Sequence, residues 1–263
     1  MKNHSVALDI LEADGLPNEL EQLDITPIPF KEEIEFRNLS FTYDRAKTPA
    51  LYDLSFTAQK GEKIGIIGES GSGKTTLVNL LLRFLTERSG GIYVDGKVLE
   101  ESDTAGWRAI VGYVQQRVFL MDATLRENVA FGEKAENIDD ERVQWAMEQA
   151  RLWDFVSTLP DGKLTRIGEN GQQLSGGQQQ RVGIARALYW NSEILVFDEA
   201  TSALDMETET AITESIESIA SGQTLFVIAH RITTLKHCDR ILEMKDGRLV
   251  AEWKYEDLIR ERL

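Results

Sequence analysis

The stretch Gly68-Glu69-Ser70-Gly71-Ser72-Gly73-Lys74-Thr75 decides how the rest of this 263-residue sequence is interpreted. It follows an apolar run of strand length, 64–67, and opens a helical pattern from Thr76 to Phe84. Its glycines permit positive φ angles, so successive backbone N–H groups can surround phosphates at the positive end of that helix. Lys74 can reach the β- and γ-phosphates, and the Thr75 hydroxyl can bind Mg²⁺. The stretch predicts a nucleoside triphosphate site at residues 68–76, and a glycine-rich turn without a ligand is the weaker alternative.

The pattern around this loop predicts an α/β fold. Ile34, Phe36, Phe41 and Tyr43 predict a half-buried strand, and further strands are predicted at 54–58, 63–67, 92–94, 194–197 and 225–228. A closing hairpin is predicted at 240–244 and 248–251. Helices are predicted at 178–189, 207–219 and 255–262, and the region from about 117 to 190 is mainly helical. Strand, helix and strand near the C-terminus imply a right-handed parallel crossover.

The composition favours a globular domain in a reducing compartment. The net charge is −15, so the surface repels phosphate backbones, which argues against a general nucleic-acid binder. The single cysteine, Cys238, excludes an intrachain disulfide. The longest apolar runs are strand-sized, whereas a membrane-spanning helix needs about 20 apolar residues. If the protein works at a membrane, we expect the spanning part on another chain or outside this one.

A second motif carries paired carboxylates. In Ile194-Leu195-Val196-Phe197-Asp198-Glu199, four apolar residues end in two acids. A buried parallel strand delivers its last residues to the ligand crevice of an open α/β sheet. We expect Asp198 to hold Mg²⁺ through water, and Glu199 to act as the general base toward the water that attacks the γ-phosphate. The alternative is a strand that ends by chance in two solvated acids. This alternative is weaker because the chain also contains the stretch at 68–75, called the phosphate loop below.

The stretch Leu174-Ser175-Gly176-Gly177-Gln178 narrows the class. It opens a predicted helix, where the serine hydroxyl and the backbone N–H groups can bind an anion, although such a turn alone is more often a simple loop. It lies about 100 residues after the phosphate loop and about 20 before the acidic pair. In this setting, residues 33–251 resemble the ABC ATPase family, whose signature motif occupies this position and meets the ATP bound to the opposite protomer. The resemblance implies a P-loop NTPase (RecA-like) core with an antiparallel β subdomain and a helical subdomain inserted at about 117–190.

The resemblance also assigns roles to single residues. Tyr43 matches the aromatic residue that stacks on adenine. Gln116, in Tyr113-Val114-Gln115-Gln116, matches the glutamine that touches Mg²⁺ or water, although the family usually has proline where this chain has Gln115. Asp205, which ends Ser202-Ala203-Leu204-Asp205, matches a residue near the dimer seam. His230 matches the histidine that contacts the γ-phosphate.

Every catalytic position of the family is intact, so we expect ATP hydrolysis rather than nucleotide binding alone. The expected catalytic residues are Glu199, His230, Lys74 and Gln116. The expected Mg²⁺ ligands are Thr75, Gln116 and Asp198.

Three segments resemble exporters more than importers. They are Asp122-Ala123-Thr124-Leu125-Arg126-Glu127-Asn128-Val129, Ile167-Gly168-Glu169-Asn170-Gly171 and Ala229-His230-Arg231. We therefore expect an exporter ATPase domain at 31–263, preceded by an arm at 1–30 that is interrupted by prolines and leads from a membrane domain. An end without fixed structure is the alternative for the arm. A peripheral importer subunit and a soluble non-transport ABC ATPase are the alternatives for the whole chain.

The expected cofactors are ATP and Mg²⁺, and the expected partners follow from the resemblance. Two such domains are expected to form a head-to-tail dimer, in which each ATP is clamped between residues 68–76 of one chain and residues 175–178 of the other. We expect ATP binding to shift the population to the closed dimer, and hydrolysis to reopen it. The other partner is a transmembrane domain, at the cytoplasmic face of the cell membrane, and no nucleic acid is expected. We expect the transmembrane domain, and not this chain, to determine the transported substrate.

Overall fold

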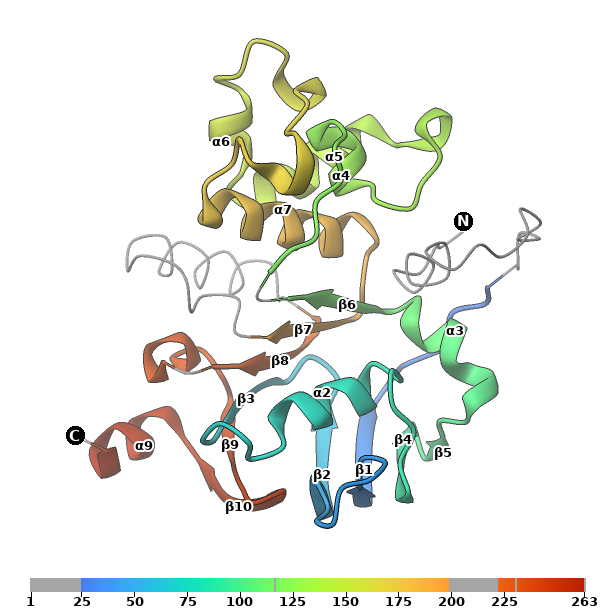
Figure 1. Ribbon diagram of the computed structural model, residues 1–263, viewed down its shortest axis with the longest axis vertical. Helices are drawn as coiled ribbons and strands as arrows, with labels where there is room; N and C mark the ends of the chain where they lie inside the picture. The colour runs from blue at the N-terminus through green and yellow to red at the C-terminus, as the bar shows by residue number, and fades with distance from the viewer. Residues whose placement is uncertain (1–24, 116, 199–221, 230, 263) are drawn as a thin grey trace.

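The computed structural model describes residues 25–115, 117–198, 222–229 and 231–262, which form two β-sheets with helices around them (Figure 1). An antiparallel sheet has the strand order β2-β1-β4-β5. A second sheet has the order β10-β9-β3-β8-β7-β6, in which the last five strands are parallel and β10 runs antiparallel to β9.

The bounds of the strands are β1 (Glu33–Phe41), β2 (Leu51–Gln59), β3 (Lys63–Ile67), β4 (Ser89–Val94), β5 (Lys97–Val98), β6 (Val111–Val114), β7 (Ile194–Asp198), β8 (Thr224–Ile228), β9 (Arg240–Lys245) and β10 (Arg248–Trp253). The α-helices are α2 (Lys74–Leu81), α3 (Thr104–Arg108), α4 (Leu125–Val129), α5 (Asp140–Gln149), α6 (Trp153–Val156), α7 (Gly176–Tyr189) and α9 (Tyr255–Arg262). Short 3₁₀ helices occur at Glu101–Asp103, Ala135–Asn137, Gly162–Leu164, Glu169–Gly171 and Ile232–Leu235.

The central strands of the six-stranded sheet are apolar because alternate side chains enter two different cores. In β3, Ile64 and Ile66 join the core shared with α2 and the antiparallel sheet, whereas Ile67 joins the core shared with α7. The residues of β7 and β8 divide in the same way. A strand that is covered on both faces shows no polar alternation, which explains the unbroken apolar runs in the sequence.

The two cores place α2 and α7 on opposite faces of this sheet. α2 packs with the antiparallel sheet, while α7 packs on the other face through Val182, Ala185 and Leu188. α4, α5 and α6 gather beside α7 at the top of Figure 1, away from the antiparallel sheet. In the described ranges, every helix is too short or too polar to cross a membrane.

The fold class predicted from the sequence is confirmed, with small shifts at the ends of elements. β3 and α9 have the predicted bounds. The strand predicted to reach Tyr43 is β1, which ends at Phe41 because the chain turns there, and the Ala46 N–H donates to the Tyr43 carbonyl at 3.0 Å. The helix predicted at 76–84 is α2, which ends before Arg83, a residue in the left-handed region with a φ of 58°.

Two other predictions reach beyond the described residues. The helix predicted at 207–219 lies outside them, and so does most of the arm predicted at 1–30. The described end of the arm packs on the domain, since Phe30 is only 2 % exposed and the Ile28 N–H donates to the Gly106 carbonyl at 3.2 Å. The domain boundary at residue 30 stays a prediction.

Asp95 fixes the chain where it enters β1. Its carboxylate accepts backbone hydrogen bonds from Lys31 at 2.8 Å, Glu32 at 2.8 Å and Glu33 at 3.0 Å. Partial burial opposes ionisation of Asp95, but the three N–H donors outweigh it, so its pKa lies below the ordinary value. The ionised form is therefore favoured in the folded chain.

We predict that Asp95→Ala lowers the free energy of unfolding by about 1 to 2 kcal/mol near neutral pH, because three donors lose a charged acceptor. A carboxyl whose pKa is lowered by folding stabilises the fold above its unfolded pKa, about 3.9, and loses this effect as the pH falls through its folded pKa. Urea unfolding at about pH 7 and about pH 3 measures the difference between the variant and the parent, which should shrink in acid. Asp44→Ala, which removes only an exposed ion pair with Arg88, is the control. A loss of stability that is equal at both pH values contradicts the role of the carboxylate.

Candidate functional site

The loop at 68–75 connects the end of β3 to the first turn of α2. Gly68 and Gly73 have φ angles of 152° and 103°, which other residues rarely adopt. A Cβ atom at Gly68 would lie 2.2 Å from the Met244 carbonyl oxygen, and one at Gly73 would lie 2.7 Å from that of Ala50. Glycine is therefore required at both positions, because the loop is packed against β9 and the start of β2.

The side chain of Lys74 folds back against the first residues of the loop. Its side chain is buried, and the ammonium group donates to the carbonyl oxygens of Gly68 at 2.7 Å and Glu69 at 3.0 Å. Thr75, the next residue, is exposed at the N-terminal end of α2. The positive charge of Lys74, the helix end and the Thr75 hydroxyl are thus gathered where the sequence predicts phosphates.

The turn between β9 and β10 holds this loop in place. The Gly247 N–H donates to the Ser72 carbonyl at 3.1 Å, and the Gly247 carbonyl accepts from the Tyr52 N–H at 2.8 Å. Gly247 has a φ of 74°, and a Cβ there would lie 2.7 Å from the Ala50 carbonyl oxygen. One glycine therefore joins the phosphate loop to β2.

Tyr43 lies in the loop after β1 rather than in a strand, and part of its ring is exposed to solvent. The side chain is 42 % exposed and shares a hydrogen bond with the Thr76 hydroxyl, at 3.2 Å between the two oxygens. The edge-to-face contact with Phe41, at 4.9 Å between centroids, fixes the ring. Tyr43 thus lies beside the first turn of α2, with an aromatic surface exposed to solvent.

Asp198, the last residue of β7, lies at the same edge of the sheet as the start of the loop. It pairs with Ile228 on β8, which in turn pairs with Ile66 on β3. Neighbouring strands are about 4.8 Å apart, so the Cα atoms of Asp198 and Ile66 are about 10 Å apart. The side chain of Asp198 lies on the α2 face, because Val196, two residues earlier, belongs to the core shared with α2. The carboxylate and the phosphate loop therefore face one region at the N-terminal end of α2.

Tyr113 holds the carboxylate of Asp198. Its hydroxyl donates to Oδ2 of Asp198 at 2.9 Å from the neighbouring strand β6. Burial, together with the charge of Asp198 and this hydrogen bond, raises the pKa of Tyr113. The tyrosine therefore stays a hydrogen-bond donor at neutral pH.

The donor types around this region fit Mg²⁺ on a nucleotide. Mg²⁺ is usually held by one or two carboxylates, water and substrate phosphates rather than by a cage of protein ligands. Asp198 offers a carboxylate and Thr75 a hydroxyl. In the described part of the chain there is no cluster of three or more His, Cys, Asp or Glu that could bind a metal.

The motif at 174–178 is at the start of α7, away from the phosphate loop. Ser175 caps this helix: its hydroxyl accepts from the Gln178 N–H at 3.3 Å, and the Gln178 side chain accepts from the Ser175 N–H at 2.8 Å. Ser175 and Gly176 are exposed. Because α7 and α2 cover opposite faces of the sheet, the structure does not bring this motif to the phosphate loop of the same chain.

Four predicted site residues, Gln116, Glu199, Asp205 and His230, lie outside the described residues. The strands that precede three of them are described. β6, β7 and β8 are parallel neighbours that end at Val114, Asp198 and Ile228, so they end at one edge of the sheet.

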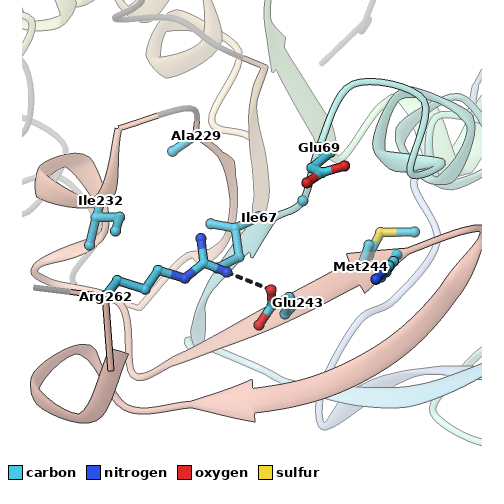
Figure 2. A pocket seen from close by; sticks show the side chains of 9 residues that line it. Ile67, Glu69, Ala229, Ile232, Glu243, Met244 and Arg262 are labelled. Atoms are coloured by element: carbon cyan, nitrogen blue, oxygen red, sulfur yellow. Dashed lines mark hydrogen bonds and ion pairs between the residues drawn. The ribbon is translucent and has the colours of Figure 1, made fainter. Parts of the chain in front are cut away.

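A cavity of about 560 Å³ adjoins the loop on the β9 side (Figure 2). Arg262, from α9, extends across it to form an ion pair with Glu243 on β9. The cavity is lined by Ile67, Gly68, Glu69, Ala229, Ile232, Glu243, Met244, Lys245 and Arg262. It connects the first residues of the loop with the chain after β8.

Sequence reasoning did not single out Tyr113 or Gly247. The Asp246-Gly247 dipeptide signals a turn, but nothing in the sequence says that the turn contacts Ser72. Tyr113 is three residues before Gln116, and only the pairing of β6 with β7 shows that it reaches Asp198.

We predict that Gly247→Ala weakens binding of a fluorescent ATP analogue by roughly tenfold, or about 1.4 kcal/mol, because its Cβ displaces the support of the loop. Gly96→Ala is the matched control: Gly96 also follows an aspartate in a hairpin turn, with a φ of 76°, but no atom lies within 4 Å of its Cβ position. Both variants carry the same backbone strain. Equal affinity of the two variants for the analogue would show that the β9–β10 turn does not position the loop.

Comparisons with known proteins identify the family of this chain. The family model described as "ABC transporter" matches residues 51–202. An ATP-dependent lipid A-core flippase of Burkholderia orbicola is 46 % identical over 228 residues, which cover 87 % of this chain and 38 % of the relative. A protein of the same name from Saccharophagus degradans is 40 % identical over 251 residues, which cover 95 % of this chain and 42 % of the relative.

A solved structure, described as a bacterial Atm1-family ABC exporter with ATP bound, superposes with a TM-score of 0.82 at 37 % identity. The match covers 92 % of this chain and 42 % of that one. The chain thus spans about two fifths of the length of these relatives. It belongs to the ABC transporter family.

Proposed function

We propose that this chain is the ATP-binding and ATP-hydrolysing domain of an ABC exporter. The observation that carries the proposal is the position of Asp198, which ends a strand on the α2 face, two strands from the phosphate loop. A nucleotide whose phosphates lie at the N-terminal end of α2 is then within reach of Lys74, Thr75 and Asp198.

In this proposal, different residues bind the phosphates, the base and the metal ion. The N–H groups of 68–76 and the Lys74 ammonium hold the phosphates, and the exposed ring of Tyr43 stacks on the base. Asp198, Thr75 and Gln116 hold Mg²⁺, which when bound neutralises charge on the β- and γ-phosphates. With a net charge of −15, the chain attracts a nucleotide only through such local donors.

Glu199 and His230 complete the reaction site. Glu199, next to Asp198 in the sequence, accepts the proton of the attacking water as a general base. His230 follows β8, the strand between the one that leads into the loop and the one that ends in Asp198, and it contacts the γ-phosphate. Asp205 lies near the seam between two such domains.

The second half of each site comes from another chain. Helix α7 covers the face of the sheet opposite to α2, and its exposed cap at Ser175 and Gly176 lies away from the loop at 68–76. We infer that one chain does not close around its own nucleotide. In a head-to-tail dimer, residues 175–178 of one chain meet the γ-phosphate bound by 68–76 of the other. ATP thereby favours the closed dimer, and its hydrolysis removes the contact.

The exporter assignment rests on the relatives and on the segment at 122–129. The relatives are named as flippases and as an Atm1-family exporter. In this chain, the Thr124 and Glu127 side chains form a capping box that fixes the start of α4, and Phe119 nearby is 56 % exposed. We propose that the surface formed by residues 119–129 contacts the transmembrane domain and that the ATPase works at the cytoplasmic face of the membrane.

We predict that Glu199→Gln lowers the rate of ATP hydrolysis by at least about a hundredfold, because the general base is lost, while ATP binding remains. In light scattering, the variant should be monomeric without nucleotide and dimeric with Mg²⁺ and ATP. Normal steady-state turnover excludes Glu199 as the base, and a monomer at high protein concentration with ATP counts against the dimer.

The control for the dimer adds Gly176→Asp to Glu199→Gln. The Cβ position at Gly176 has no atom within 4 Å, and aspartate is tolerated in the first turn of a helix. The double variant should therefore fold and bind ATP at its own loop. It should stay monomeric, because the new carboxylate would face the γ-phosphate of the partner's nucleotide. A dimer of the double variant would show that the cap of α7 does not meet the nucleotide.

A further inference from the structure

We propose that Tyr113 is a positioning residue for metal binding: its hydroxyl fixes the Asp198 carboxylate in the orientation that receives Mg²⁺ with the nucleotide. The proposal rests on the proposed function, in which Asp198 holds Mg²⁺ through water. It adds a residue from β6, a different strand from those that carry the phosphate loop and the acidic pair. The contact that carries it is the 2.9 Å hydrogen bond from the Tyr113 hydroxyl to Oδ2 of Asp198.

The backbone places both partners of this bond independently of it. Tyr113 pairs with Val196, two residues before Asp198, in the parallel register of β6 and β7. Both side chains lie on the α2 face, since Tyr113 packs against the core that contains Val196. The sheet register therefore presents the phenol to the carboxylate.

The ring of Tyr113 is held from the side of α2. It makes an edge-to-face contact with Phe84, at 6.5 Å between centroids, and the Arg108 guanidinium lies 4.9 Å from the centre of the Phe84 ring. Arg108 in turn donates to the carbonyl oxygens of Leu82 at 3.0 Å and Arg83 at 2.7 Å. The chain that follows α2 is thus fixed to α3, and this packing contacts the Tyr113 ring without involving Asp198.

The fixed position of the Tyr113 hydroxyl matters because the Asp198 carboxylate must keep one orientation to hold the metal ion. A carboxylate at the end of a strand can rotate about its terminal bond, and an outer hydrogen bond that holds one oxygen reduces this freedom. Loss of such outer partners typically weakens metal affinity by about 10- to 100-fold. A hydrogen bond that only joins β6 to β7 would instead change stability and leave metal affinity unchanged.

Tyr113→Phe separates these two roles, since it removes one oxygen atom and keeps the ring against Phe84. Binding of a fluorescent ATP analogue is titrated in EDTA and in excess Mg²⁺, and the ratio of the two affinities measures the coupling between metal and nucleotide. We expect the affinity in EDTA to match that of the parent chain and the enhancement by Mg²⁺ to fall by roughly tenfold. The electron paramagnetic resonance spectrum of Mn²⁺ bound with the analogue should also broaden, because its surroundings become less uniform.

Tyr189→Phe is the matched control. The Tyr189 hydroxyl is buried in the helical region and accepts one hydrogen bond, from the Asp139 N–H at 3.2 Å. Urea unfolding should show similar losses of stability for the two variants, and only Tyr113→Phe should lose metal enhancement. An unchanged enhancement in Tyr113→Phe overturns the positioning role and leaves the proposed function intact. Absence of any Mg²⁺ effect or of nucleotide binding in the parent chain overturns the metal site itself, and both proposals with it.

Discussion

The parallel alignment of β3, β8 and β7 is the constraint on which the rest of the site depends. Parallel strands end at a common edge of the sheet. The loop after β3 and the carboxylate at the end of β7 therefore lie at the same edge, two strands apart. The loop leads into α2, and the side chain of Asp198 lies on the face of the sheet that α2 covers. Both groups therefore face the same region. The chemistry that we propose needs a cationic, donor-rich loop and an anionic strand end at the same edge of the sheet, on the same face. This sheet order supplies both.

The six-stranded sheet also separates the phosphate loop from the motif at 174–178. α2 carries the phosphate loop on one face, and α7 carries the exposed serine cap on the other. On the function that we propose, a single chain presents half a nucleotide site, and the nucleotide is part of the contact between two chains. The strongly acidic chain disfavours that contact when no ligand is present. Local order around the site is maintained by neighbours in space, with Gly247 beneath the loop and Tyr113 beside Asp198.

Most of the fold could be predicted because the apolar runs are unambiguous: β3 and β7 are buried on both faces, and their neighbours in the sequence are glycine-rich or acidic. Errors arose where local geometry overrides periodicity. Tyr43 continues the alternation of β1, yet a turn removes it from the strand, and Arg83 ends α2 with a left-handed φ that no propensity predicts. Tyr113 and Gly247 could not be found from the sequence, because their contacts are with residues far away in the chain.

The most direct test of the shared metal–phosphate site is the location of Mn²⁺ by anomalous diffraction in crystals grown with a non-hydrolysable ATP analogue. The account predicts one peak at the N-terminal end of α2, about 2.1 Å from the Thr75 hydroxyl and linked through water to Asp198, with the phosphates inside the loop at 68–75. A metal that is bound elsewhere, or phosphates that lie outside the loop, would contradict the account.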